Sequence, residues 1–296
     1  MRVSPLWSNE IRQHPNILKQ HQSLFEQKTI LMESVLDKVT ILSDDPLSSN
    51  FYTMLKKFSL HHRYCSKGSY YQKCYKLGCI TILIEPIFSR IPKIKVILNP
   101  SNAGLTFEQV KSWVLFLFDS YQNVYVSRVE YKIDLHGYHP LEVMKRIWCS
   151  GIRKYNDERY EGQTLYIGSR FSNTQRVIYD KGRERGQTSN AWTRIEVRER
   201  YKGHEKIPFT QFIRYLRLYN PFENVLLVDL SSTVLSKKLH KFNSELSKEG
   251  VATVIRTLKQ LTSNQKKSII NALQEEGSLL YLEWIYRNNL NRWLKN

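Results

Sequence analysis

Two segments of the sequence alternate charged side chains with apolar ones. Ser127–Asp134 reads SRVEYKID, and Thr193–Arg198 reads TRIEVR. Because successive side chains of a β-strand point to opposite faces, each segment predicts a strand with one apolar and one charged face. The charged faces carry the acids Glu130, Asp134 and Glu196. Acids on adjacent strands lie about 5 Å apart, so a pair of them has the spacing to share a divalent cation.

These acids have a second interpretation, because each one lies beside an arginine or a lysine. Opposite charges on neighbouring strands stabilise a sheet as cross-strand ion pairs. Glu130 and Asp134 are four residues apart on one strand, about 13 Å, and therefore cannot both bind one ion. A metal site would need Glu196 together with either of them. On alternation alone, the ion-pair interpretation is favoured over the metal site.

A predicted hairpin places tyrosines next to charged residues. Its sequence, TLYIGSRFSNTQRVIYDKG from residue 164 to 182, reads as a strand, a Gly-Ser turn, a second strand and a glycine turn. Tyr179 adjoins Asp180 and Lys181. A phenol has a pKa of about 10 and attacks poorly at neutral pH unless a base, a cation or a metal assists it. The cluster suits phosphotyrosyl chemistry, whereas a tyrosine in a strand more often only packs.

The overall composition indicates a polyanionic partner. The 296 residues include 45 Lys and Arg against 27 Asp and Glu, which gives a formal net charge of +18. At 41% hydrophobic residues the chain can bury a core and is not a disordered basic tail. A strongly basic protein most often binds nucleic acid, and no cationic amphipathic membrane anchor is evident.

The positive charge is concentrated in residues 51–100. This stretch has nine Lys and Arg against one acid, Glu85, a net charge of 9 − 1 = +8. Four tyrosines are interleaved with these cations: Tyr64, Tyr70, Tyr71 and Tyr75. Lysines bind phosphates, and aromatic rings stack on unpaired bases. The stretch therefore predicts contact with DNA, and a solvated basic edge with core tyrosines is the alternative.

The pattern along the chain predicts an α+β protein, with an antiparallel-sheet core, flanking helices and a helical C-terminal part. We expect a helical arm at 1–50, an α+β catalytic and DNA-binding domain at 51–235 and a basic helical region at 236–296. Strands are expected at 79–88, 93–98, 124–135, 164–167, 176–180 and 192–201. Helices are expected at 106–118, 141–153, 236–248, 251–261, 264–275 and 278–294. In the arm, helical spacing relates Ile30, Leu31, Val35, Leu36 and Val39.

Several other classes are disfavoured. Four cysteines do not make a disulfide framework in a chain of this length, so a reducing cytoplasm is expected. No run approaches the about 20 apolar residues of a membrane span, and no secretory signal is evident. One group fits no common zinc-ligand spacing: Cys65, Cys74, Cys79, His61 and His62. His136 and His139 follow a strand and are interpreted as turn residues.

Four segments, in this order, resemble the signature of the Rep_trans-type replication initiators: SRVEYKIDLHG, TLYIGSR, RVIYDKG and WTRIEVR. The resemblance covers roughly residues 70–205. The family serves rolling-circle plasmids and has relatives in filamentous phages and among relaxases of integrative elements. This chain departs from the usual pattern at Glu130, where the family has aspartate, and retains Asp134. The resemblance implies a nickase fold and an enzyme that nicks and rejoins origin DNA through a 5′-phosphotyrosyl link.

The resemblance also implies residue roles. Tyr179 is the expected nucleophile, Tyr166 is the alternative, and Lys181 assists. The carboxylates expected to hold Mg²⁺ or Mn²⁺ are Glu196 with Asp134 or Glu130. In these segments the residues expected to contact DNA are Arg128, Arg170, Arg176, Arg194 and Arg198, and the basic stretch at 51–100 adds Lys67, Lys73 and Lys76.

The expected partners are double- and single-stranded origin DNA, a host helicase and polymerase, and a second copy of the chain in a homodimer, with no membrane. A host helicase is needed because a P-loop signature is absent. Two alternatives remain open at this point. One is a conjugative relaxase with the same chemistry, and the other is a non-catalytic DNA-binding protein that keeps the fold.

Overall fold

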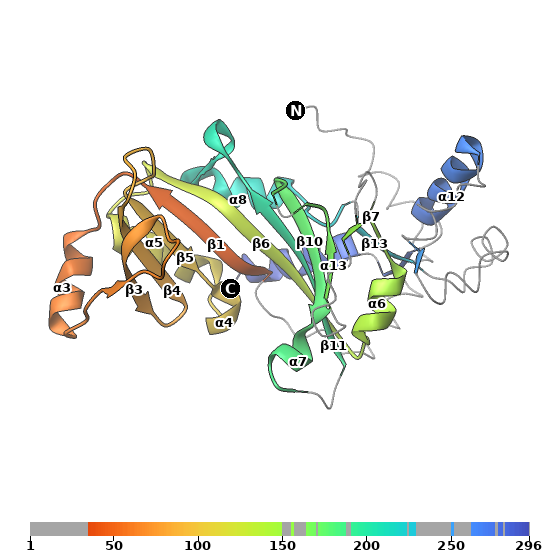
Figure 1. Ribbon diagram of the computed structural model, residues 1–296, viewed down its shortest axis with the longest axis horizontal. Coiled ribbons are helices and arrows are strands. Elements are labelled where there is room, and N and C mark those ends of the chain that lie inside the picture. Colours follow the sequence, from red (N-terminus) through yellow and green to blue (C-terminus); the bar gives the residue numbers. More distant parts are fainter. Residues whose placement is uncertain are drawn as a thin grey trace.

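One large antiparallel sheet dominates the computed structural model, which describes residues 35–149, 155–156, 164–169, 171–187, 191–223, 225–228, 250–251, 262–275, 278–280 and 282–295 (Figure 1). Its strand order is β2-β3-β4-β5-β1-β6-β11-β10-β9-β8, and β12 pairs with β6. Every pair of neighbouring strands is antiparallel. The predicted α+β class with an antiparallel sheet and flanking helices is confirmed.

The strands of this sheet are β1 (Leu36–Ser43), β2 (Arg63–Tyr64), β3 (Tyr71–Leu77), β4 (Ile80–Pro86), β5 (Ile94–Leu98), β6 (Val124–His136), β8 (Tyr155–Asn156), β9 (Thr164–Ile167), β10 (Thr174–Asp180), β11 (Trp192–Arg200) and β12 (Ile207–Pro208). A smaller sheet contains β7 (Ile147–Cys149), β13 (Val225–Val228) and β14 (Ser278–Leu280). The helices are α3 (Ser49–Lys57), α4 (Pro100–Ala103), α5 (Phe107–Phe118), α6 (Pro140–Arg146), α7 (Lys181–Glu184), η3 (Gly203–Glu205), α8 (Phe209–Leu218), α12 (Ser263–Glu275) and α13 (Leu282–Trp293).

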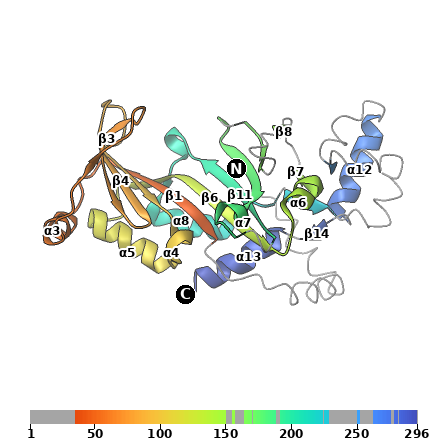
Figure 2. The same ribbon diagram turned by 60° about the horizontal axis from the view of Figure 1, so that its bottom comes forward.

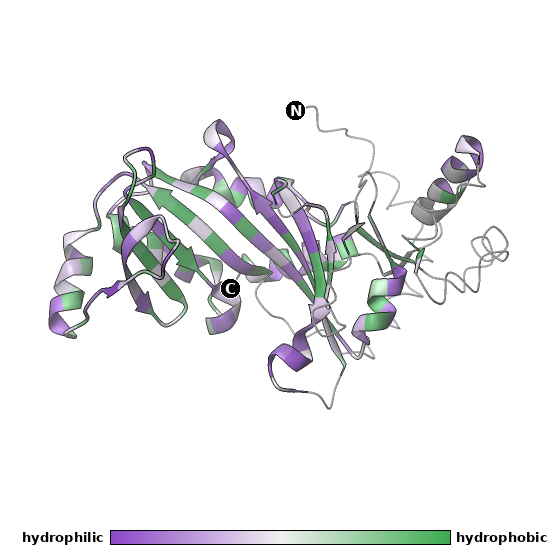
Figure 3. Cartoon of the chain, viewed as in Figure 1, coloured by the Kyte–Doolittle hydropathy of each residue, from purple (hydrophilic) through white to green (hydrophobic). Residues whose placement is uncertain are grey.

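One face of the sheet packs against α5, α8 and α13, which lie on the same side in Figure 2. The apolar side chains of β6 and β11 turn to this face, and Figure 3 shows the alternation of polar and apolar residues along the strands. Tyr131 of β6 makes an edge contact with Tyr286 of α13 at 5.8 Å between ring centroids. The Trp293 indole donates a hydrogen bond to the Leu105 carbonyl at 2.8 Å. The C-terminal helix therefore belongs to the main core.

Helix α5 begins where the sequence predicts. Thr106 accepts a hydrogen bond from the Gln109 backbone, and the Gln109 side chain accepts one from the Thr106 backbone. This reciprocal pair satisfies two of the backbone donors that a helix start leaves without partners. The apolar side of the helix, with Val110, Val114 and Leu117, is fully buried.

The helix predicted through Val35, Leu36 and Val39 is wrong, because Leu36–Ser43 forms the central strand β1. The remainder of the predicted arm, residues 1–34, lies outside the described residues. The helix predicted at 141–153 is also too long. Helix α6 ends at Arg146, and Ile147–Cys149 pairs with β13 as strand β7.

The predicted C-terminal helices have mixed outcomes. Helix α12 confirms the prediction at 264–275. The helix predicted at 278–294 is preceded by strand β14 and begins at Leu282. The prediction at 236–248 lies outside the described residues, as does nearly all of the one at 251–261. No helix in the described ranges is long and apolar enough to cross a membrane.

Candidate active site

The charged face of the sheet is a ladder of alternating acids and cations. Strands β6 and β11 pair antiparallel so that Arg194 lies opposite Asp134, Glu196 opposite Lys132, and Arg198 opposite Glu130. Each acid therefore faces a cation, as the ion-pair interpretation predicts. Glu196 lies diagonally from both other acids, at the about 7–8 Å typical of diagonal cross-strand neighbours.

Asp134 and Arg194 form the buried centre of this ladder. The guanidinium donates to both carboxylate oxygens at 2.7 and 2.9 Å, and Lys132 donates to one of them at 2.7 Å. The Arg194 side chain is only 1% exposed. Burial alone would raise the pKa of the Asp134 carboxyl, but the hydrogen bonds and charges of Arg194 and Lys132 lower it far below its usual value. Asp134 is therefore an ionised, fully paired carboxylate.

The phenol of Tyr179 donates a hydrogen bond to Glu196 Oε1 at 2.7 Å. The second oxygen of Glu196 accepts two hydrogen bonds from the Arg198 guanidinium at 2.9 and 2.7 Å. Burial, and then the charge of Glu196, raise the pKa of the Tyr179 phenol far above its usual value. Burial also raises the pKa of Glu196, against the opposing charge of Arg198. This places a protonated phenol directly on a carboxylate with increased basicity.

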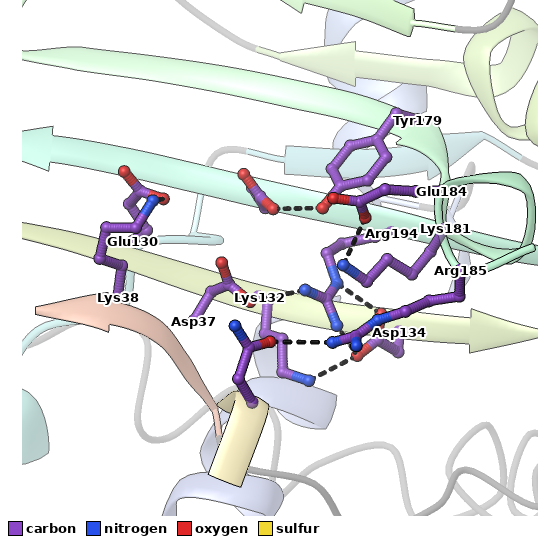
Figure 4. Close-up of polar contacts among 12 residues, drawn as sticks. Asp37, Lys38, Glu130, Lys132, Asp134, Tyr179, Lys181, Glu184, Arg185 and Arg194 are labelled. Atoms are coloured by element: carbon purple, nitrogen blue, oxygen red, sulfur yellow. Dashed lines mark hydrogen bonds and ion pairs between the residues drawn. The ribbon is translucent and has the colours of Figure 1, made fainter. Parts of the chain in front are cut away.

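Tyr179 and Glu196 line an open cleft of about 380 Å³ on the charged face. Figure 4 shows Tyr179, Lys181 and Glu184 at one end of the polar cluster and Lys38 with Glu130 at the other. The lining residues come from β1, β6, β10, β11, α7 and the segment around α4: Asp37, Lys38, Asn99, Asn102, Glu130, Tyr179, Lys181, Glu184, Arg185, Glu196 and Arg198. The cleft is almost entirely polar, with acids and cations in close contact.

Lys181 follows Tyr179 closely in the chain and stays next to it in space. Its ammonium lies 5.7 Å from the centre of the Tyr179 ring and forms an ion pair with Glu184. Asp180 begins α7 by accepting a hydrogen bond from the Arg183 backbone at 2.9 Å. The short helix turns the chain sharply after β10. This turn brings the buried Lys181 side chain back over the Tyr179 phenol.

The structure brings in cleft residues that the sequence did not indicate. Asp37 accepts a hydrogen bond from Arg194 Nη1 at 2.6 Å, and Lys38 pairs with Glu130 at 3.2 Å. On the opposite side, Arg185 donates to the Asn102 side chain at 2.8 Å. Asp37 and Lys38 were missed because their strand was taken for a helix. Recognition of β1 as a strand beside β6 would have indicated both.

The other expected site residues are spread over both faces. Tyr166 of β9 lies opposite Val177 of β10 and does not line the cleft. Arg176 lies opposite Val197. It is an odd number of residues from Tyr179 along β10, so its side chain lies on the other face of the sheet. Arg128 pairs with Glu130 at 2.5 Å. Arg170 lies outside the described residues.

Arg194 was expected to bind phosphate, but the structure places its side chain in the buried centre of the ladder. Its guanidinium is buried and holds Asp134 and Asp37, so it is not presented to the cleft surface. Lys67, Lys73 and Lys76 lie far along the sheet from Tyr179, on the loop and strand between β2 and β4. Of the predicted arginines that the structure describes, only Arg198 lines the cleft.

The residues expected to hold a divalent cation do not form a ligand cluster. Asp134 is bound by Arg194 and Lys132, Glu196 by Tyr179 and Arg198, and Glu130 by Lys38. Within the described part of the chain, no group of three or more His, Cys, Asp or Glu side chains has the arrangement of a metal site. The carboxylates are thus satisfied by cations and a phenol in this arrangement, and the metal stays a prediction.

The remaining histidine and cysteine candidates do not line the cleft. His136 was expected to be a turn residue but is the last residue of β6. Its ring is tilted against Trp192 at 4.7 Å between ring centroids, and the Trp192 indole donates to Asp134 at 3.0 Å. His139 is the residue that precedes α6. All four cysteines are free thiols.

Comparison with known protein families matches a stretch that contains three of the four motif segments, and the first segment, at residues 127–137, precedes it. The family of replication initiation factors matches residues 141–271, which is 131 of the 296 residues and includes Tyr179, Lys181, Arg194, Glu196 and Arg198. This part of the chain is similar to replication initiators, and the resemblance seen in the sequence is confirmed. No curated protein matches the chain.

Among solved structures, the chain is similar to a rolling circle replication initiator protein from Geobacillus stearothermophilus. The two share 12% sequence identity with a TM-score of 0.43. The similarity covers 73% of this chain and 97% of that chain.

Proposed function

We propose that this protein is a rolling-circle replication initiator that nicks and rejoins origin DNA, with Tyr179 as the nucleophile. The observation that carries the proposal is the 2.7 Å hydrogen bond from the Tyr179 phenol to Glu196 in an open polar cleft. A nucleophile held on a base is the arrangement that activates a weak hydroxyl nucleophile. Both residues lie within the stretch that matches replication initiation factors.

In the proposed reaction the phenol oxygen of Tyr179 attacks the scissile phosphorus. A Tyr179–phosphorus ester forms, the bond from phosphorus to the 3′ oxygen breaks, and the phenolic proton passes to Glu196. The departing 3′ oxygen takes a proton from solvent water, which reaches the open cleft, and becomes the primer hydroxyl. Because the raised pKa of Tyr179 keeps the phenol protonated at neutral pH, the proton must leave during the attack, and Glu196 is placed to accept it.

The neighbouring cations fit the charge that develops on the phosphate. Lys181 lies over the phenol ring, and Arg198 holds the carboxylate on its other side. Arg194 and Asp134 act through position, because they fix the register of β11 against β6. A divalent cation, Mg²⁺ or Mn²⁺, would neutralise the phosphate when bound, and no step above depends on it.

The proposal includes the partners expected from the sequence. These are origin DNA in double- and single-stranded form, a host helicase and polymerase in the cytoplasm, and a second copy of the chain. The relaxase alternative shares the chemistry and differs in the DNA site. The non-catalytic alternative is less favoured, because a protein that only binds DNA does not need a tyrosine held on a buried base.

The test is nicking of supercoiled DNA that carries the origin of the replicon encoding this protein. With Mg²⁺ or Mn²⁺ present we expect conversion to open circles, and none from plasmid without that origin. Chelation of the divalent cation tests the metal prediction in the same assay. A folded protein that binds the origin and leaves it supercoiled would favour the binding module, and cleavage only at a transfer origin would favour the relaxase.

We expect Glu196→Gln to slow nicking about 10²- to 10⁴-fold, because glutamine keeps a hydrogen-bond acceptor for Tyr179 but cannot take its proton. The base must be ionised to act, so the wild-type rate should fall as the pH drops through the raised pKa of Glu196. The glutamine variant should not show this fall of the nicking rate at low pH. Rate measurements from pH 5 to 8 check both effects, with Glu142→Gln on the exposed side of α6 as the control. If the nicking rate of the glutamine variant still falls at low pH, Glu196 is not the base.

A further inference from the structure

The end of the sheet farthest from β10 carries an unusual concentration of exposed aromatic side chains. We call residues 49–92, which contain α3, β2, β3 and β4, the edge lobe; it forms one end of the elongated molecule in Figure 1. Seven of the twelve exposed large apolar side chains in the described residues lie here: Tyr52, Phe58, Leu60, Tyr64, Tyr70, Ile87 and Phe88. Scattered surface apolar residues need no explanation, but this clustering does.

The edge lobe is also strongly basic. Between residues 49 and 92 the sequence has seven Lys and Arg and one acid, so its net charge is 7 − 1 = +6. The single acid, Glu85, is paired with Lys73 at 2.7 Å. The Glu85 carboxylate is therefore already paired with one of the seven cations of the lobe. Lys56, Lys57, Arg63 and Lys76 of the lobe are exposed, and the Lys57 ammonium lies 5.6 Å from the centre of the Phe58 ring.

Two of the exposed rings form a defined pair. Tyr70 and Phe88 are 65% and 46% exposed, and their ring centroids are 6.4 Å apart. The backbone holds them, because the Ile87 amide donates to the Tyr70 carbonyl at 2.9 Å where β3 begins and β4 ends. The Arg90 guanidinium lies 5.7 Å from the centre of the Phe88 ring. Tyr64, at 79% exposed, stands on β2 opposite Lys73.

We propose that the edge lobe binds single-stranded DNA, with unpaired bases stacked on Tyr70, Phe88 and Tyr64 and phosphates bound by the surrounding cations. Every base has a flat face that stacks on an aromatic ring, whereas the bases of a duplex are already stacked on each other. A basic surface without rings would suffice for duplex DNA. A protein partner is less well matched, because a net charge of +6 would have to be desolvated in the contact.

The position of the edge lobe makes it a second DNA contact, apart from the cleft. Six strand-to-strand steps separate β3 from β10 in the sheet, which is about 29 Å at the usual spacing of neighbouring strands. If Tyr179 attacks as proposed above, the edge lobe would hold the melted strand at a distance from the nick. The lobe also lies outside residues 141–271, which match the initiator family.

The experiment measures equilibrium binding of labelled 20-nucleotide oligo(dT) and of a duplex of equal length, both in EDTA so that no cleavage intervenes. We expect Tyr70→Ala and Phe88→Ala each to weaken binding to the single strand roughly 5- to 150-fold, with a change of about twofold or less for the duplex. Arg90→Ala should reduce the slope of log affinity against log salt by about 0.7 for one lost phosphate contact.

Tyr70→Phe is the matched control, since it removes the hydroxyl and keeps the ring, and it should bind like the wild type. Tyr125→Ala removes a partly exposed ring of β6 outside the edge lobe and should also have no effect. Equal losses for single strand and duplex, unchanged affinity in both alanine variants, or no binding of the single strand by the wild type would each overturn the proposal. The binding result does not depend on nicking, so failure of either proposal is visible separately.

Discussion

Replacing Tyr179 with phenylalanine is expected to abolish the covalent protein–DNA adduct and to reduce nicking by about a thousandfold or more. The variant keeps the ring under Lys181 and removes only the oxygen that would attack phosphorus. Loss of a nucleophile removes the whole covalent route and not a fraction of the transition-state stabilisation. The measurement is denaturing electrophoresis of the protein after incubation with an end-labelled single strand that contains the nick site.

Tyr166→Phe is the matched control for this experiment. Tyr166 lies on β9, on the same face as Tyr179, but has no contact with Glu196 and does not line the cleft. We expect the control to form the adduct at close to the wild-type rate. An adduct that persists in the Tyr179 variant and disappears in the Tyr166 variant would transfer the nucleophile to Tyr166.

The second large effect is expected from Arg194→Met, which should lower the free energy of unfolding by about 3–5 kcal/mol. Removal of one partner of a buried ion pair leaves the other charge buried without compensation. Here Asp134 would lose both guanidinium hydrogen bonds and keep only those from Lys132 and Trp192, and Asp37 would lose the hydrogen bond from Arg194. Denaturant unfolding followed by circular dichroism measures the change.

Lys73→Ala is the control, because the Lys73–Glu85 pair lies at the surface and such pairs contribute about 1 kcal/mol or less. The cost of Arg194→Met should also depend on pH. Since the pKa of Asp134 is lowered in the folded state, its pair contributes stability above the usual carboxyl pKa and loses it as the pH falls toward the lowered value. A variant as stable as the wild type at pH 7 would show that the pair contributes nothing net.

Strands β6, β9, β10 and β11 all begin and end within two residues of the predicted positions. Strands β9 and β10 were indicated by the turn residues that bound the predicted hairpin. In β6 and β11 a period of two separates the core face from the charged face. Pairing register then follows, since a slip of one residue would turn the charges into the core.

Strand β1 could not be predicted in the same way, and the reason is local. Its pairing with β6 shifts register between Leu36 and Lys38 and again between Thr40 and Ile41. An extra residue at such an irregularity breaks the period of two. Buried Leu36 and Val39 are therefore three residues apart, a spacing that in sequence is typical of a helix.

Strand β7 illustrates a different limit. Ile147 continues the apolar spacing of α6 and in sequence looks like its next turn. In the structure it pairs with Leu227 of β13, 80 residues further along the chain. A short apolar segment takes its conformation from a partner of this kind, and local propensity does not reveal the partner.

The chemistry of the acids was the least predictable part. Sequence spacing limits which carboxylates are neighbours, but it does not say whether a cation side chain or a metal lies between them. Glu196 was expected to be a metal ligand, and in the structure it holds the Tyr179 phenol and the Arg198 guanidinium. The directions in which the side chains of β10 and β11 point decide whether Glu196 binds a metal or these two side chains.

The hydrogen bond from Arg194 to Asp37 joins residues 157 positions apart. During synthesis, β1 can pair with β5 and β6 once residues up to His136 have left the ribosome. Glu130 and Lys132 then have partners on β1 and β6, whereas Asp134 must wait for β11 before it acquires Arg194. The cleft is thus assembled late, after a ribosome has delivered Arg198. If Tyr179 is the nucleophile, as proposed, the nascent chain has no base beside it until β11 is complete, because Glu196 lies on that strand.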